Sequence, residues 1–125
     1  MDKKYLAKII ATDHDGLNLI SACCSGAKVK IDNIKYLSSN KVFLLFIERK
    51  KNELDKNQKR INSICKFDFI DKVKSKNINQ QNNELELELI AIDYLKNKED
   101  FEINLIFDNN AQIILIAETI EVKIG

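Results

Sequence analysis

The chain has 125 residues, of which 45% are hydrophobic and 31% are charged, and its formal net charge is +1. This length suits one domain with its own hydrophobic core, so we predict a single domain over residues 1–125. The composition excludes a disordered chain, and no apolar run approaches the roughly 20 residues of a membrane span. The first residues also lack a signal-peptide pattern, so we expect a cytoplasmic protein with no membrane partner.

The cysteine and histidine content argues against a metal site. The three cysteines, Cys23, Cys24 and Cys65, are an odd number, and two of them are sequence neighbours that cannot easily bridge each other. This pattern favours reduced thiols in a reducing compartment. His14 is the sole histidine, so the ligands for structural zinc are lacking. We therefore expect neither a metal nor a cofactor.

The N-terminal part predicts a strand followed by one helix. Residues 5–11 are largely apolar, and Thr12 or Asp13 can accept hydrogen bonds from the free amides of a helix start. Gly26 can end the helix after about three turns by adopting a left-handed conformation. The apolar side of the helix consists of Leu17, Ile20 and Cys24.

The rest of the chain predicts strands. Apolar and polar residues alternate in most segments, whereas the run 42–47 is apolar on both faces and belongs in the middle of a sheet or beneath the helix. We predict an α+β fold, with one N-terminal helix packed on a curved, mostly antiparallel sheet or partly open β-barrel of about seven or eight strands. The predicted strands cover residues 27–32, 42–47, 84–92, 101–107, 111–117 and 120–124, together with the central stretch 59–78.

The central stretch also carries a charge pattern. Lysines at positions 72, 74 and 76 precede glutamates at 84, 86 and 88, and the two sets would pair as antiparallel neighbours. Residues 1–83 hold 17 basic and 9 acidic side chains, while residues 84–125 hold 3 and 10. Such pairing would neutralise much of this asymmetry within the fold. The core-facing side chains of the stretch are expected to be Phe67, Phe69 and Val73.

Two arginines stand out against 18 lysines. The planar guanidinium group binds carboxylates and phosphates through two parallel hydrogen bonds, so Arg49 and Arg60 are candidate contacts to an anion or partner. Asp68 completes this candidate set, and a purely structural ion pair is the alternative. The segment between the two arginines is rich in charge, and we predict a mobile loop over residues 50–59.

The leading functional hypothesis is a non-catalytic binding or adaptor module for a protein or an anionic ligand, because the strand pattern comes without a catalytic motif. One alternative is an enzyme or enzyme subunit that uses the Asp13/His14/Asp15 cluster with Cys65. Another is a weak RNA binder through the basic segment 49–60. That segment lacks the interleaved aromatic residues of nucleic-acid sites, which disfavours a nucleic-acid partner. A homodimer is a further alternative, because a sheet with an exposed apolar face would need a partner to bury that face.

Four groups of residues follow one another along the chain. They are a helix start and helix (Ala11, Asp13, Leu17, Ile20, Ser21, Ala22), a strand that ends in arginine (Tyr36, Leu37, Phe43, Arg49), a basic cluster with a strand (Lys59, Arg60, Phe67, Asp68, Ile70, Val73, Ile78) and a C-terminal segment (Ala117, Glu118, Ile120, Glu121). In order and spacing they resemble the bacterial family DUF2948, a domain of unknown function. The chain departs from the family pattern at Ser25-Gly26, at Lys50-Lys51 and at Asn77. The resemblance implies no substrate, cofactor or catalytic residue.

Overall fold

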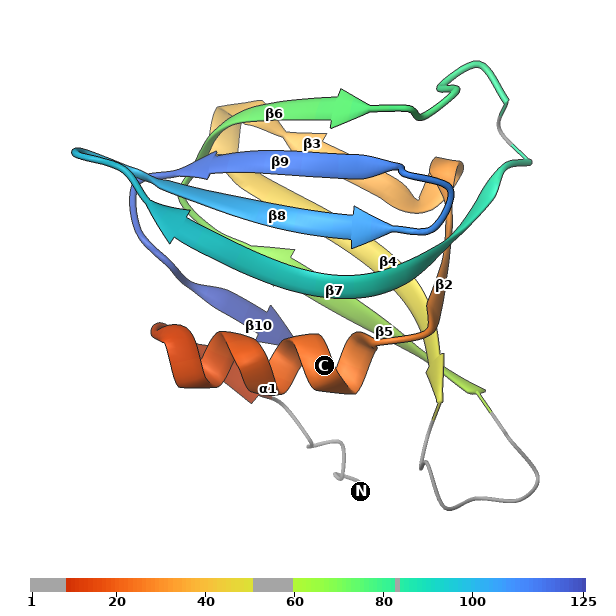
Figure 1. Ribbon diagram of the computed structural model, residues 1–125, viewed down its shortest axis with the longest axis horizontal. Coiled ribbons are helices and arrows are strands. Elements are labelled where there is room, and N and C mark those ends of the chain that lie inside the picture. Colours follow the sequence, from red (N-terminus) through yellow and green to blue (C-terminus); the bar gives the residue numbers. More distant parts are fainter. Residues whose placement is uncertain (1–8, 51–59, 83) are drawn as a thin grey trace.

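The computed structural model describes residues 9–50, 60–82 and 84–125 (Figure 1). Within these residues the protein consists of one helix, ten strands and two short 3₁₀ turns, η2 (Ile31–Asn33) and η3 (Ser38–Asn40). The expected mobile loop 50–59 lies outside the described residues, except for the last residue of a strand, Lys50. The helix is α1 (His14–Cys24), and the strands are β1 (Ile9–Ala11), β2 (Ala27–Lys30), β3 (Ile34–Leu37), β4 (Val42–Lys50), β5 (Arg60–Phe67), β6 (Ile70–Lys76), β7 (Glu86–Lys96), β8 (Phe101–Phe107), β9 (Gln112–Ala117) and β10 (Val122–Ile124).

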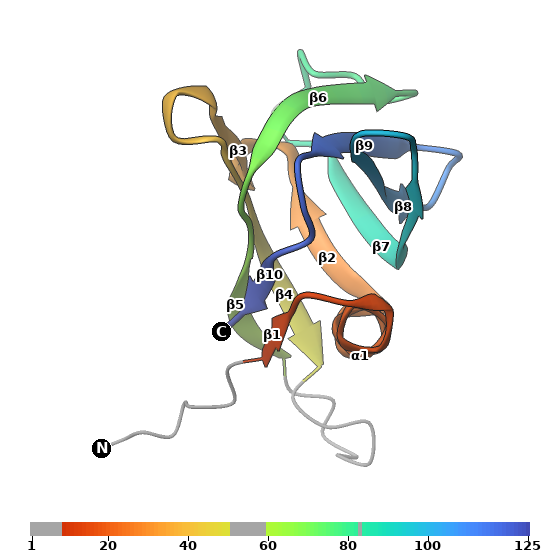
Figure 2. The same ribbon diagram turned by 90° about the vertical axis from the view of Figure 1, so that its left-hand side faces the viewer.

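All ten strands belong to one antiparallel sheet, which confirms the predicted fold class of one helix with a mostly antiparallel sheet. The strand order is β1-β10-β5-β4-β2-β7-β8-β9-β6, and β3 pairs with β4 beside this path. The sheet curls strongly but stays open, as Figure 2 shows. It is therefore not a closed barrel.

The number of strands corrects the prediction of seven or eight. The central stretch forms two strands, β5 and β6, because the chain turns sharply at Asp68-Phe69. Residues 34–37 form a separate strand, β3, because the turn η2 ends β2 at Lys30. The break in alternation at Asp32-Asn33 indicates the turn before β3, whereas the turn at Asp68-Phe69 is not visible because the apolar pattern continues on both sides of it.

Helix α1 lies across one end of the sheet, against β1 and β7 (Figures 1 and 2). The Asp13 Oδ1 atom accepts a hydrogen bond from the Gly16 amide at 2.8 Å, and Gly26 has a φ of +84° after the last turn, as predicted. The Ser21 Oγ atom accepts the Ile92 amide of β7 at 2.9 Å. The helix is too short to cross a membrane, and no other described segment forms a membrane-spanning helix.

The core lies inside the curl of the sheet, where side chains from alternate strand positions meet. Phe43 and Phe67 pack edge to face, with ring centroids 5.9 Å apart. Phe69 was predicted to face the core, and this was wrong: its side chain is 42% exposed and its φ is +62°. The turn between β5 and β6 reverses the alternation, so the next residue, Ile70, is buried instead.

The predicted pairing of lysines and glutamates was also wrong. Strand β6 pairs with β9, where Lys74 lies opposite Ile114. The glutamates of β7 pair with β2 instead, with Lys28 opposite Glu88 and Lys30 opposite Glu86. Strand β6 is thus an edge strand of the sheet, and its lysines do not pair with the glutamates that follow them in the sequence.

Candidate functional site

Arg49 and Arg60 lie close together at one end of the β4–β5 pair, where Arg49 faces Ile61 in the strand register. The Arg49 Nε atom donates a hydrogen bond to the Oγ atom of buried Ser63 at 2.8 Å. The Arg60 Nη1 atom donates to the carbonyl oxygens of Gly26 at 3.3 Å and Glu48 at 3.2 Å. Both arginines therefore have internal partners, and their role as anion contacts stays a prediction.

Asp68 lies at the opposite end of β5. It forms ion pairs with Lys66 at 3.7 Å and with Lys123 at 3.4 Å. Its Oδ2 atom is buried and has no hydrogen-bond partner among the described residues, although Lys123 lies within ion-pair distance of it. Eight residues of extended strand separate Asp68 from Arg60, which corresponds to roughly 26 Å. The structure therefore does not bring the three candidate residues into one site.

The cysteine pair lies near Arg49 but far from the helix start. The Sγ atoms of Cys24 and Cys65 are 3.5 Å apart, and both side chains are fully buried. The two thiols share a hydrogen bond in which either sulfur can donate. This bond lowers the pKa of Cys24, and together with burial it raises the pKa of Cys65.

The same geometry bears on the enzyme alternative. His14 begins α1 and Cys24 ends it, so the two are about 15 Å apart along the helix. Since Cys65 touches Cys24, it cannot also reach the Asp13/His14/Asp15 cluster. The His14 ring packs against Tyr94 instead, with centroids 5.6 Å apart. Among the described residues, no group of three or more ligand-type side chains could hold a metal ion.

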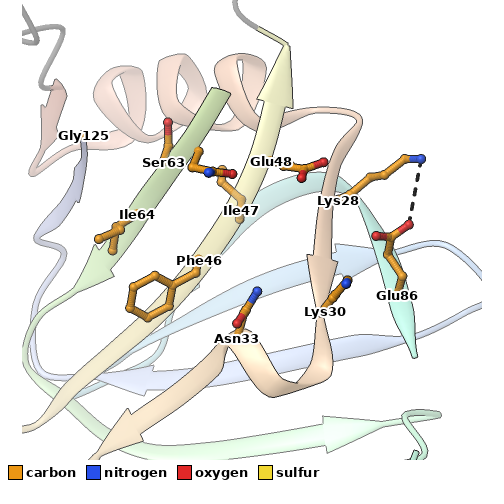
Figure 3. A pocket seen from close by; sticks show the side chains of 11 residues that line it. Lys28, Lys30, Asn33, Phe46, Ile47, Glu48, Ser63, Ile64, Glu86 and Gly125 are labelled. Carbon is orange, nitrogen blue, oxygen red and sulfur yellow. Dashed lines mark ion pairs between the residues drawn. The ribbon is translucent and has the colours of Figure 1, made fainter. Parts of the chain in front are cut away.

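The outer surface of the sheet is hollowed over β2, β4 and β5 (Figure 3). We call this feature the outer-face hollow; its volume is about 480 Å³. Phe46 and Ile64 form its apolar floor, with exposed fractions of 36% and 42%. It is lined by Lys28, Lys30, Asn33, Phe46, Ile47, Glu48, Asn62, Ser63, Ile64, Glu86 and Gly125.

A second hollow of about 470 Å³ lies where the curled sheet fails to close, between β3 and β6. We call it the seam. Figures 1 and 2 show that β3 and β6, which supply about half of its lining, lie near each other. It is lined by Ile31, Asp32, Ile34, Lys35, Tyr36, Phe43, Val73, Ser75, Ile78, Gln80 and Ile113.

The seam is fastened at one end. The Tyr36 hydroxyl donates a hydrogen bond to the Ile70 carbonyl at 2.8 Å, so a side chain of β3 contacts the backbone of β6 there. The Ile70 amide donates to the Lys41 carbonyl at 2.8 Å. The Lys41 Nζ atom also contacts Glu118 at 2.6 Å and Asp71 at 3.0 Å, and these carboxylates raise its pKa. These contacts connect the two sides of the seam at this end, although β3 and β6 do not pair as strands in the described sheet.

The rim of the seam is basic. Four exposed lysines lie on its two strands. Lys35 is among the lining residues, as is the acidic Asp32, whereas the three lysines of β6 alternate with the lining residues of that strand and lie on its outer face. No ion pair between described residues involves any of these lysines. Sequence reasoning missed this surface because it assigned the β6 lysines to the glutamates of β7. The rim lysines are Lys35, Lys72, Lys74 and Lys76.

Comparison with known proteins identifies one family. A family model described as "Protein of unknown function (DUF2948)" matches residues 7–125. No curated protein and no solved structure matches the chain.

Proposed function

The chain belongs to the DUF2948 family of proteins of unknown function, and we propose that it is a non-catalytic binding module that holds an acidic, extended segment of a partner protein in the seam. The observation that supports this proposal is an open sheet whose two facing edges carry an apolar floor and a basic rim.

The backbone of the seam supports binding of an extended chain. In the described part of the sheet, β3 pairs on one side with β4, and β6 pairs on one side with β9. Their other edges carry backbone N–H and C=O groups without a strand partner. An added strand gains affinity by hydrogen bonding to such an edge, and it gains specificity from pockets for every second side chain.

The side chains of the seam favour an acidic, amphipathic segment. Ile34, Val73 and Ile113 offer apolar contacts to side chains that point inward. The outward side chains of the same segment would lie beside the rim lysines, where carboxylates are favoured and basic groups are repelled. Edge lysines also discourage pairing with a second basic edge. A segment that alternates apolar and acidic residues is therefore the partner that fits best.

A peptide-binding experiment tests this proposal. An eight-residue fluorescein-labelled peptide of alternating Val and Glu is titrated with the protein, and fluorescence anisotropy measures Kd; the matched probe replaces every Glu with Lys. We expect the acidic peptide to bind at least about tenfold more tightly. Amide signals of 34–37 and 70–76 in a two-dimensional NMR spectrum should shift on binding.

Charge-reversal variants locate the site. The variant Lys72→Glu/Lys74→Glu should lose at least about tenfold in affinity, because it replaces two rim charges. The control Lys96→Glu/Lys98→Glu makes the same charge change at the turn between β7 and β8 and should bind like the wild type. Equal affinity of both variants, or equal affinity of both peptides, would refute the proposal. Tighter binding of a single-stranded RNA at the same lysines would assign the surface to nucleic acid instead.

A further inference from the structure

We propose that the outer-face hollow is the contact surface of a symmetric dimer, so that its occupant is a second copy of this chain. The proposal does not depend on the function of the seam. The seam is lined from β3 and β6, whereas the hollow is lined mainly from β2, β4 and β5. The two features adjoin at the turn η2, where Asp32 lines the seam and Asn33 lines the hollow.

The floor of the hollow supplies an apolar contact at its centre. Phe46 and Ile64 are directly opposite each other on β4 and β5, and both point to the solvent side of the sheet (Figure 3). Large apolar side chains at adjacent exposed positions are typical of the central part of a protein interface. The Phe46 ring, in particular, offers a large apolar area with few rotatable bonds.

The rim of the hollow argues for a copy of the same chain rather than for a partner of one charge. Four charged side chains line it, two basic and two acidic, and one pair of them, Lys28 and Glu86, lies 3.8 Å apart within the chain while both side chains stay partly exposed (Figure 3). A two-fold axis presents the same patch to itself, so a patch of one sign would repel its copy. A patch with both signs can place the lysines of one copy beside the glutamates of the other. The four charged residues are Lys28, Lys30, Glu48 and Glu86.

The charge balance also separates this surface from the seam. The rim of the seam is basic, so two seams would repel each other and cannot form a symmetric contact. A dimer built on the hollow leaves both seams accessible. It would therefore present two binding seams to a partner with repeated segments, which raises the overall affinity through effective concentration.

Sedimentation velocity of the wild type from low to high micromolar concentration tests the dimer. We expect a concentration-dependent shift from monomer to dimer. The Phe46→Lys variant should remain a monomer, because it places a charge at the centre of the contact. The control Ile106→Lys changes a residue of similar exposure, 39%, on β8 and should dimerise like the wild type. A wild type that is monomeric throughout, or two variants that dimerise equally, would overturn the proposal.

A charge-swap experiment makes the test independent of any folding defect in one variant. The variant Lys28→Glu/Lys30→Glu has an acidic rim, and Glu48→Lys/Glu86→Lys has a basic rim. Each variant alone should be monomeric, because like charges would meet across the two-fold axis. An equimolar mixture should restore the dimer, and native mass spectrometry should identify it as a heterodimer. A mixture that stays monomeric while both variants keep the wild-type circular dichroism spectrum would contradict charge complementarity at this surface.

Discussion

Replacing Arg60 with methionine tests whether this rare arginine holds the fold together. Its Nη1 atom donates hydrogen bonds to the carbonyl oxygens of Gly26 and Glu48, and so connects the turn after α1 with β4. The Gly26 amide donates in turn to the Leu89 carbonyl of β7 at 2.7 Å. Methionine keeps an unbranched apolar stem but removes the charged donor.

The expected loss follows from the two hydrogen bonds. A bond from a charged donor contributes about 1.5–3 kcal/mol in a good geometry. Both distances, 3.2 and 3.3 Å, are long, and Arg60 is partly exposed, so we expect a total loss of about 1–2 kcal/mol. A chain of this size loses roughly 4 °C in Tm for each kcal/mol, so Tm should fall by about 4–8 °C.

Urea unfolding followed by circular dichroism measures this loss for Arg60→Met. The control Lys98→Met removes an exposed charge at a turn and should change stability by less than about 0.5 kcal/mol. If Arg60→Met were as stable as the control, Arg60 would not fasten the turn. Addition of phosphate then separates the two roles, because an anion site at Arg60 predicts that phosphate stabilises the wild type and not the variant.

Three further changes test the seam and the turn that precedes it. Tyr36→Phe should cost about 1–3 kcal/mol in urea unfolding, because it leaves the buried Ile70 carbonyl without its donor. The pKa of Lys41 is raised in the folded state, so its ion pairs stabilise the fold fully below the unfolded pKa of about 10.4 and less as the pH rises further. When the pH is raised above this value, the urea concentration at the midpoint of unfolding should therefore fall less for Lys41→Met than for the wild type. Phe69→Asn should stabilise the protein by up to about 1 kcal/mol, because asparagine adopts the positive φ more readily; a thermal melt with a lower Tm would contradict this reasoning.

The sequence by itself determined the local structure of this protein. The spacing of Leu17, Ile20 and Cys24 and a capping residue at position 12 or 13 predicted α1, because these signals act within one or two helical turns. Alternating apolar residues predicted most strands and the antiparallel fold class. The resemblance to the DUF2948 family also came from the order of short motifs, and the family match over residues 7–125 confirms it.

The tertiary structure decided which strands became neighbours and therefore which surfaces exist. The charge pattern placed the lysines of β6 beside the glutamates of β7, whereas β6 pairs with β9 and leaves the sheet open. Arg49 and Arg60 were visible as rare residues, yet their acceptors come from Ser63 and from the backbone of Gly26 and Glu48. The two hollows are assembled from strands that are distant in sequence. Alternation specifies the face of the sheet on which a side chain lies, but it does not specify which strand pairs with which. Only the folded chain decides that pairing.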